Sequence, residues 1–246
     1  MKEKVIGIMG AMPEEINSIM ELLEEKHLVT IGKRAYTSGK INGIKVVVVF
    51  SRWGKVAAAT TVSTLILEFK ITELIFTGVA GAINHQLRIG DIVIARRLIQ
   101  HDMDARPLMA QYEIPLLNIT FFDVQEVPLA AAGDAISGML EVLGGLIEGN
   151  AFHITQPRLF VGDIASGDRF FADSQAKASL QKQLPSILCV EMEGAAVAQV
   201  CHEYDIPYIV IRTISDVADE QSPIDFASFI RQISNRYSME IIRRLI

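Results

Sequence analysis

Short apolar runs alternate with segments of helical periodicity along the whole chain. The runs are rich in β-branched residues, and several are apolar at consecutive positions, as in strands that are covered on both faces. They predict strands at Val5–Met9, Lys45–Ser51, Leu74–Thr77, Asp91–Ala95, Leu159–Val161, Ile187–Glu191 and Tyr208–Thr213. Apolar residues at spacings of three and four predict helices at Glu14–Glu24, Lys55–Phe69, Gly194–Tyr204 and Phe226–Leu245. This alternation predicts an α/β fold around a central sheet. Since no repeat or linker divides the chain, we expect one domain over residues 1–246.

The stretch His101–Pro128 is the least regular part of the sequence. It holds three prolines and a group of aromatic residues, Tyr112, Phe121 and Phe122. A plain surface loop is one interpretation. A loop of this length in a compact domain is more often functional or part of an interface, and exposed aromatic side chains are unfavourable. We therefore expect a lid or a subunit contact.

Composition narrows the class of protein. Half of the residues are hydrophobic and the mean hydropathy is +0.31, which fits either a membrane protein or a protein that buries much surface in a core or a subunit interface. The longest apolar runs, Ile44–Phe50 and Leu74–Ala82, are too short for a membrane-spanning helix, which needs about 20 apolar residues. The net charge of −6 argues against a nucleic-acid partner. The first residues lack the long apolar stretch of a secretory signal, so we expect a cytoplasmic protein.

Carboxylates and glycines follow the predicted strands, where ligands bind in parallel α/β sheets. The sequence contains no G-x-S-x-G motif and no phosphate-binding P-loop. Its five histidines are isolated and lack metal-ligand spacing. We therefore expect neither covalent serine or cysteine catalysis nor a metal or other cofactor.

The carboxylates differ in what their positions indicate. Glu14 opens a predicted helix, where an acidic side chain interacts favourably with the helix dipole. Glu191 and Glu193 flank Met192 at a strand end, and strand alternation directs both to one side, where ribose hydroxyls or an arginine would relieve their repulsion. Asp216 ends another buried strand, and either it or Asp219 fits a helix cap. The pattern alone indicates an acid-rich site at strand ends, which is compatible with a hydrolase.

Several motifs in order extend this interpretation. They are Gly7–Glu15, Gly54–Ala59, Thr77–Gly81, Gly90–Val93, Ser166–Asp168, Val190–Ala196 and Arg212–Asp219. Together they resemble the bacterial 5′-methylthioadenosine/S-adenosylhomocysteine nucleosidases of the purine nucleoside phosphorylase and uridine phosphorylase superfamily. The resemblance implies a three-layer α/β/α fold with a central mixed, twisted sheet, and a homodimer. It also implies hydrolysis of the N-glycosidic bond of 5′-methylthioadenosine and S-adenosylhomocysteine, and of 5′-deoxyadenosine, with release of adenine.

The same resemblance implies the catalytic residues. Asp216 resembles the acid that protonates purine N7 as the base departs, with Ser215 supporting it. Glu15 resembles the general base for the attacking water, and Arg212 the basic residue beside them. The two carboxyl groups suit these opposite roles if their environments separate their pKa values.

The substrate-binding residues also follow from the resemblance. Glu193 holds the ribose hydroxyls with Met192 packed on the sugar, and Glu191 lies behind it or on the ribose. Phe170 stacks on adenine, and Phe171 lines that pocket through its backbone. The remaining predicted pocket residues are Met12, Trp53, Val79 and Phe226 of the chain itself, with Ala105 and Leu108 from the dimer partner around the 5′ substituent.

The sequence departs from the commonest family pattern in three places. Val79 stands where some members have serine, so one hydroxyl near the water site is missing. Arg52 and Trp53 replace a smaller pair, and Trp53 either reshapes the pocket, which its position favours, or packs in the core. The segment Gln100–Asp104 and the proline-rich loop after it resemble only part of the family, so substrate preference can differ there.

Other functions remain open alternatives. A phosphorylase needs basic partners for phosphate. The segment Leu74–Gly78 contains no arginine, and Glu15 would repel the anion. Arg52 is the one residue that keeps a phosphorylase open as an alternative. The same chemistry on 6-amino-6-deoxyfutalosine, in menaquinone synthesis, is a second alternative. A non-catalytic nucleoside-binding protein would require loss of an acid or base, whereas Glu15, Glu193 and Asp216 are all present.

Overall fold

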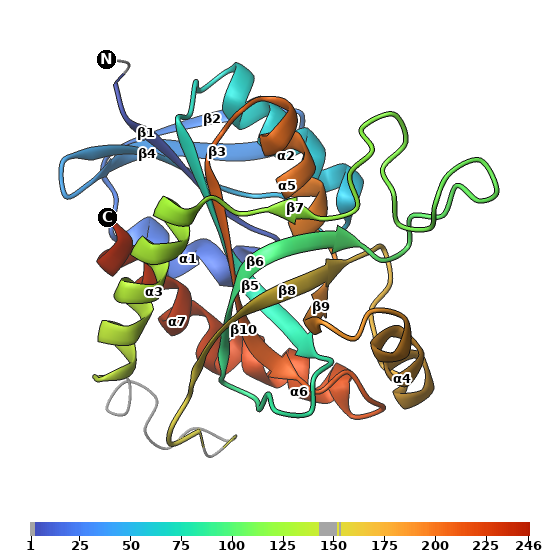
Figure 1. Ribbon diagram of the computed structural model, residues 1–246. Helices are drawn as coiled ribbons and strands as arrows, with labels where there is room; N and C mark the ends of the chain where they lie inside the picture. Colours follow the sequence, from blue (N-terminus) through green and yellow to red (C-terminus); the bar gives the residue numbers. More distant parts are fainter. Residues whose placement is uncertain (1–2, 143–151, 153) are drawn as a thin grey trace.

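A mixed β-sheet runs through the centre of the protein in the computed structural model, which describes residues 3–142, 152 and 154–246 (Figure 1). The strand order is β10-β6-β8-β9-β5-β1-β4-β3-β2, and the short β7 pairs with β6. The strands are β1 (Val5–Gly10), β2 (Glu24–Ile31), β3 (Arg34–Ile41), β4 (Ile44–Phe50), β5 (Glu73–Ala82), β6 (Ile92–Gln100), β7 (Phe122–Asp123), β8 (Leu159–Ser166), β9 (Ile187–Glu191) and β10 (Tyr208–Asp216).

Part of the sheet closes on itself. β5 pairs in parallel with β10, which pairs antiparallel with β6, and the parallel pairs β6–β8 and β8–β9 lead back to β5 through an antiparallel pairing of β9. The remaining strands extend from β5 through β1, which is parallel to both β5 and β4. In this closure, Gly81 of β5 is opposite Asp216 of β10 and Val190 of β9. The topology thus gathers the ends of β5, β9 and β10 in one place, and two of these strands end in an acid, Glu191 and Asp216.

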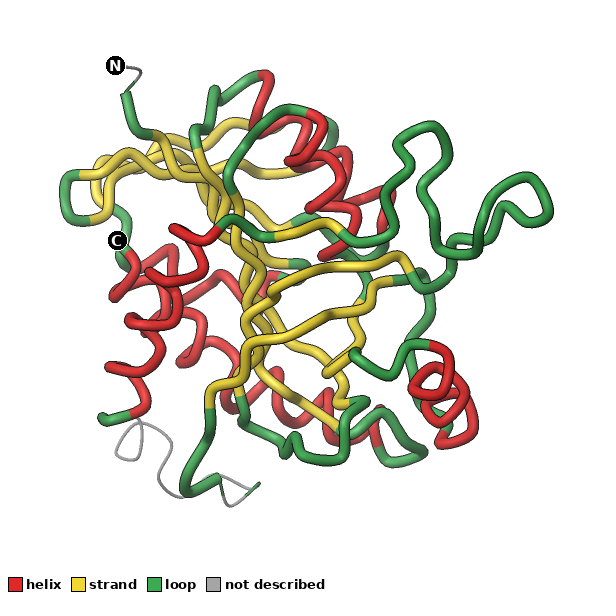
Figure 2. The backbone as a smooth tube through the Cα atoms, in the orientation of Figure 1, coloured by secondary structure: helices red, strands yellow, loops and turns green. Residues whose placement is uncertain are grey.

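Helices lie on both sides of the sheet. α2 packs on α5 on one side, while α1 and α3 both pack on α7 on the other (Figures 1 and 2). The predicted α/β fold with a central mixed, twisted sheet between helical layers is therefore confirmed. The helices are α1 (Pro13–Glu21), α2 (Lys55–Leu67), α3 (Glu126–Leu140), α4 (Ser174–Gln183), α5 (Gly194–Glu203), α6 (Ser222–Phe229) and α7 (Asn235–Leu245), with a π-helical segment at Ile230–Ser234.

Several element predictions need correction. The predicted helix Glu14–Glu24 ends at Glu21, because the chain enters β2 at Glu24. The predicted single helix Phe226–Leu245 is three segments, because a π-helical turn separates α6 from α7. The hairpin β2–β3 was not predicted: it lies at the sheet edge, and β2 is mostly exposed, so it lacks a continuous apolar run. Helices α3 and α4 were also missed; α4 buries only Leu180 and therefore shows little apolar periodicity.

The stretch His101–Pro128 is largely irregular, as predicted, although it includes β7 and the start of α3. Figure 2 shows two of its loops projecting from the body of the protein. Among the helices in the described parts of the chain, none combines the length and apolar content needed to cross a bilayer.

Candidate active site

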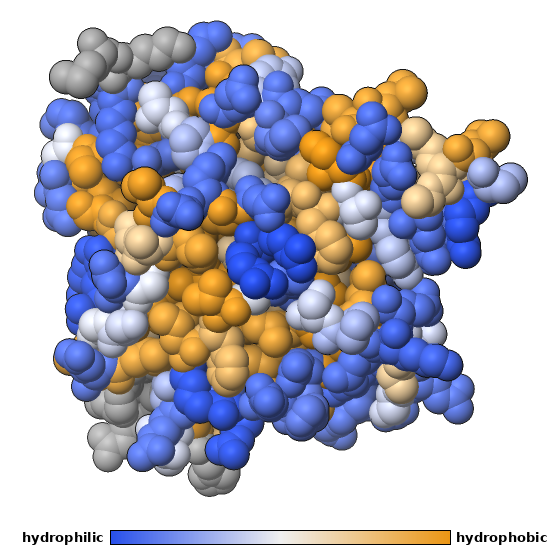
Figure 3. Space-filling model, in the orientation of Figure 1, coloured by the Kyte–Doolittle hydropathy of each residue, from blue (hydrophilic) through white to orange (hydrophobic). Residues whose placement is uncertain are grey.

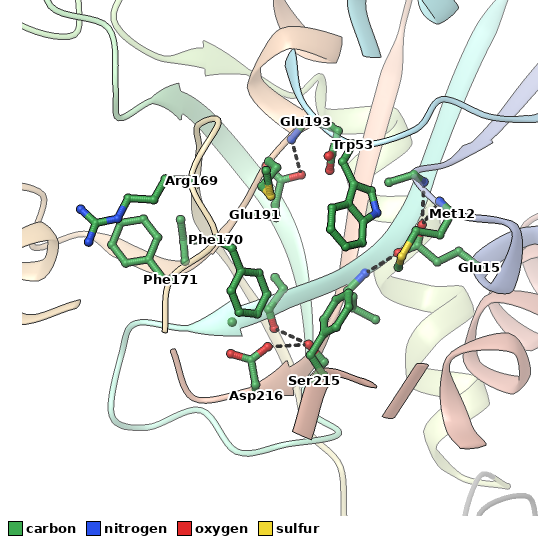
Figure 4. A pocket seen from close by; sticks show the side chains of 17 residues that line it. Met12, Glu15, Trp53, Arg169, Phe170, Phe171, Glu191, Glu193, Ser215 and Asp216 are labelled. Atoms are coloured by element: carbon green, nitrogen blue, oxygen red, sulfur yellow. Dashed lines mark hydrogen bonds between the residues drawn. The ribbon is translucent and has the colours of Figure 1, made fainter. Parts of the chain in front are cut away.

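A pocket opens where β1, β5, β9 and β10 end (Figure 4). It contains every site residue predicted above except Arg212, Ala105 and Leu108. Its walls also include residues that were not predicted, mostly small or apolar side chains that carry no chemical signal in a sequence. The complete lining is Ala11, Met12, Glu15, Trp53, Val79, Ala80, Gly81, Arg169, Phe170, Phe171, Val190, Glu191, Met192, Glu193, Ser215, Asp216 and Phe226.

Glu15 lies in the first turn of α1 and is almost completely buried. Its Oε2 accepts hydrogen bonds from the backbone N–H groups of Ala11 (2.6 Å) and Met12 (3.0 Å), and its Oε1 accepts one from Val79 (3.2 Å). A Cβ at Gly78 would lie 2.7 Å from Oε1, so the carboxylate needs glycine there. Burial raises the pKa of Glu15, while the charge of Arg212 and the backbone donors oppose the rise.

Asp216 occupies another side of the cavity from Glu15 in the view of Figure 4, where Phe170 lies next to Asp216 and Trp53 lies nearer Glu15. Its Oδ2 accepts a hydrogen bond from the Ser215 hydroxyl (2.8 Å) and its Oδ1 one from the Ala218 N–H (2.9 Å). Burial raises its pKa above that of an ordinary aspartate, against these donors. The group is thus biased toward holding a proton.

Helix α4 holds the loop that follows Asp216. The Lys177 ammonium donates to the Val217 carbonyl (2.6 Å), and the Ser174 hydroxyl donates to Glu220 (2.7 Å). The Asp219 carboxylate accepts a hydrogen bond from the Gln221 N–H (3.0 Å) just before α6. Neither acid of this pair is the N-cap of α6, which is Gln221 and makes no side-chain cap hydrogen bond, so the expected helix cap is wrong.

Glu191 and Glu193 have different partners. Glu191 ends β9 and accepts hydrogen bonds from the Arg212 guanidinium (2.7 Å), the Ser166 hydroxyl and the Gly194 N–H (2.8 Å). Glu193 lies beyond the strand, and its Oε1 accepts one from the Gly54 N–H (2.8 Å). Burial, with repulsion from Glu191, raises the pKa of Glu193 to about 8. The arginine thus neutralises Glu191, and Glu193 is the acid of the pair with fewer protein partners.

Arg212 lies behind the cavity, not in its wall. Only 1% of it is exposed, and its guanidinium lies 3.9 Å from the ring centroid of Phe76. It donates to the carbonyls of Phe76 (3.3 Å) and Ile211 (3.1 Å). The resemblance implied a position near Glu15, and the charge of Arg212 does act on Glu15, although its ion pair is with Glu191.

An aromatic group covers the pocket. The Phe226 ring meets Phe170 edge-on at 5.5 Å and Trp53 edge-on at 6.0 Å between centroids. Trp53 is 54% exposed and therefore shapes the pocket instead of packing in the core. Ala105 and Leu108 lie outside this pocket on a projecting loop, where Leu108 is 89% exposed. Within the residues that the structure describes, no cluster of three or more His, Cys, Asp or Glu is placed to hold a metal ion.

Comparisons with known proteins indicate the family of the chain. The model of the phosphorylase superfamily matches residues 5–246. A relative from Bacillus thuringiensis subsp. konkukian, named 5′-methylthioadenosine/S-adenosylhomocysteine nucleosidase, is 32% identical over 240 residues, which cover 98% of this chain and 97% of the relative. The chain belongs to the 5′-methylthioadenosine/S-adenosylhomocysteine nucleosidase family.

Solved structures include members of this nucleosidase family and another hydrolase. The Neisseria meningitidis nucleosidase in complex with methylthio-immucillin-A has a TM-score of 0.87 and 31% identity, covering 98% of each chain. The futalosine hydrolase of Helicobacter pylori has a TM-score of 0.86 and 32% identity, covering 98% of this chain and 97% of that one. The comparisons therefore establish the nucleosidase family and leave two substrate classes among similar structures.

Proposed function

We propose that this protein hydrolyses the N-glycosidic bond of 5′-methylthioadenosine and S-adenosylhomocysteine, and of 5′-deoxyadenosine, to adenine and the 5-substituted ribose. One observation carries the proposal: Glu15 and Asp216 are buried carboxyl groups on different sides of one pocket, and each has its own hydrogen-bond donors. Two carboxyl groups in different environments suit a base and an acid in one reaction. Family membership supports the same reaction.

In the proposed reaction, the bond between C1′ and N9 breaks and a bond forms from C1′ to a water oxygen. Asp216 gives its proton to N7, which neutralises the electron pair that the purine takes with it. Glu15 accepts a proton from the water, and the charge of Arg212 behind it favours its ionised form. Ser215 orients the Asp216 carboxyl group through their hydrogen bond.

Glu193 binds the ribose hydroxyls in this proposal. Its carboxylate stabilises the positive charge that the sugar gains as the bond to the base breaks. Met192 packs against the sugar and Phe170 against the purine, with Phe171 beside it, while Met12, Val79, Trp53 and Phe226 enclose the rest. Glu191 is tied to Arg212 and Ser166, so we assign it the support of this region rather than direct binding.

Phosphate is a poor fit for this pocket. Arg169 is the one basic residue among those that line it, and its guanidinium lies over Phe171, 5.1 Å from the ring centroid. Arg52 does not line the pocket and donates to the Lys33 carbonyl (2.7 Å). We expect adenine release from methylthioadenosine at the same rate in phosphate-free buffer and after phosphate is added. Strict dependence on phosphate would identify a phosphorylase instead.

Aminofutalosine is the second candidate substrate, favoured by the similarity to the Helicobacter pylori futalosine hydrolase. The residues that would select it are those around the 5′ substituent: Trp53, which lines the pocket, with Ala105 and Leu108 from the proposed dimer partner. Comparison of kcat/KM on methylthioadenosine, adenosylhomocysteine, 5′-deoxyadenosine and aminofutalosine decides between the two. A clear preference for aminofutalosine would replace the thioadenosine assignment while retaining the chemistry.

We also propose that the protein is a homodimer in which the projecting loop of each chain completes the partner's pocket. Leu108 and Leu116 are each 89% exposed on this segment, and Figure 3 shows apolar side chains at the ends of the projecting loops. Such apolar surface is typical of an interface. Leu108→Asp is expected to shift the protein toward monomer in sedimentation experiments and to raise KM. A variant that remains dimeric with unchanged KM would contradict this role.

A further inference from the structure

Three residues far apart in the sequence form a closed ring of hydrogen bonds beside the pocket, which we call the polar ring: Lys55, Asp102 and Asp168. The Lys55 ammonium donates to Asp102 Oδ1 (2.6 Å), and the Asp168 N–H donates to Asp102 Oδ2 (2.9 Å). The Lys55 N–H donates to Asp168 Oδ1 (2.8 Å) and closes the ring. None of the three lines the pocket.

The polar ring fixes the start of α2. Gly54 precedes this helix and contributes no side-chain cap, so the free N–H groups of the first turn need acceptors from elsewhere. Asp168 accepts the Lys55 N–H, and Glu193 accepts the neighbouring Gly54 N–H. Gly54 has a φ of +93°, and a Cβ there would lie 3.0 Å from Asp168 Oδ1. Both the backbone conformation and the close approach of the polar ring therefore favour glycine at this position.

The polar ring also connects separate walls of the site. Lys55 follows Trp53 and Gly54, Asp168 precedes Phe170, and Asp102 leads into the projecting loop. The Lys55 ammonium makes a second hydrogen bond, to the Gln100 side chain (3.1 Å). The lysine and Asp102 side chains are only 19% and 31% exposed, so solvent screens their interaction less than that of a surface ion pair.

We propose that the polar ring positions the Gly54 N–H so that it donates to Glu193. The ring thereby fixes the orientation of the carboxylate that binds ribose. The role of Glu193 rests on the proposed function, whereas the hydrogen bond does not. Because Asp102 belongs to the ring, displacement of the projecting loop also displaces the donor of Glu193. Asp102, Lys55 and Asp168 thus act through Gly54 and not on the substrate.

Opposite charge changes test the proposal. Lys55→Met removes a positive charge and Asp102→Asn a negative one, so a purely Coulombic influence would move the pKa of Glu193 in opposite directions. Loss of the Gly54 hydrogen bond raises it in both variants, since that donor favours the ionised form. The other charged groups that act on Glu193 are Glu191, Arg212 and Glu15, and neither variant changes them.

The experiment combines a carboxyl-detected NMR titration of Glu193 in the free protein with the pH dependence of kcat/KM. We expect both variants to raise the pKa of Glu193 and to lower kcat/KM on methylthioadenosine about 10- to 100-fold. Lys55→Arg should recover most of the loss, and Lys45→Met, which removes a surface pair with Glu3, should match wild type. Unfolding temperatures show whether each variant folds. If Lys55→Met does not fold, Asp102→Asn alone provides the test.

The outcomes separate the two proposals. An unchanged Glu193 titration in both variants, or opposite shifts, overturns the positioning role. A wild-type protein that releases no adenine overturns the proposed function, and the titration still decides the role of the polar ring.

Discussion

Asp216→Asn is expected to lower kcat by about 100- to 10,000-fold, the range that a general acid contributes, while nucleoside binding is largely retained. An amide cannot give a proton to N7, yet it keeps the size of the side chain. In the wild-type protein the Ser215 hydroxyl and the Ala218 N–H donate to the Asp216 carboxyl oxygens, and the asparagine oxygen can still accept one of these hydrogen bonds. Adenine release under single-turnover conditions measures the chemical step, and calorimetry with a non-hydrolysable analogue measures binding.

Asp219→Asn is the matched control for this variant. Asp219 lies three residues away and its carboxylate accepts the Gln221 N–H, which an asparagine oxygen also accepts. We expect near wild-type turnover from the control. Near-normal turnover in Asp216→Asn itself would remove Asp216 from the acid role, whatever the control shows.

Burial explains which parts of the fold were predictable from the sequence. β1 and β10 are almost wholly buried, as is the centre of β4, so their apolar runs predicted strands directly. β2 is mostly exposed at the edge of the sheet and contains charged residues, which hides it from the same reasoning. The closure of β5 on β9 and β10 depends on strand pairings that no single segment encodes.

The site was predictable only to the level of residue type and position. The carboxylates at strand ends were visible, and the motifs assigned roles to them. The hydrogen-bond partners that distinguish Glu191 from Glu193 were not, because Arg212 and Gly54 come from distant elements. The polar ring was missed for the same reason: its three members belong to separate motifs, and only the fold brings them together.

Glu15→Gln is expected to lower kcat about 100- to 10,000-fold because the water loses its proton acceptor. The two Glu15 oxygens accept three backbone N–H groups, whereas glutamine has one acceptor oxygen and would turn its NH₂ toward at least one donor. We therefore also expect a lower unfolding temperature. Glu14→Gln is the matched control, since Glu14 is exposed on the same turn of α1, and it should behave as wild type.

The pH dependence of this variant separates a base from a structural residue. Burial raises the pKa of Glu15 and raises that of Glu193 to about 8, so activity that needs both groups ionised falls as the two carboxylates become protonated at lower pH. Asp216 must be protonated, so activity also falls at high pH. On the acid side, the logarithm of wild-type kcat/KM should rise with a slope of about two, and in Glu15→Gln with a slope of about one. A slope that does not change between the two proteins would show that Glu15 is not the base, because its ionisation would then not govern the rate.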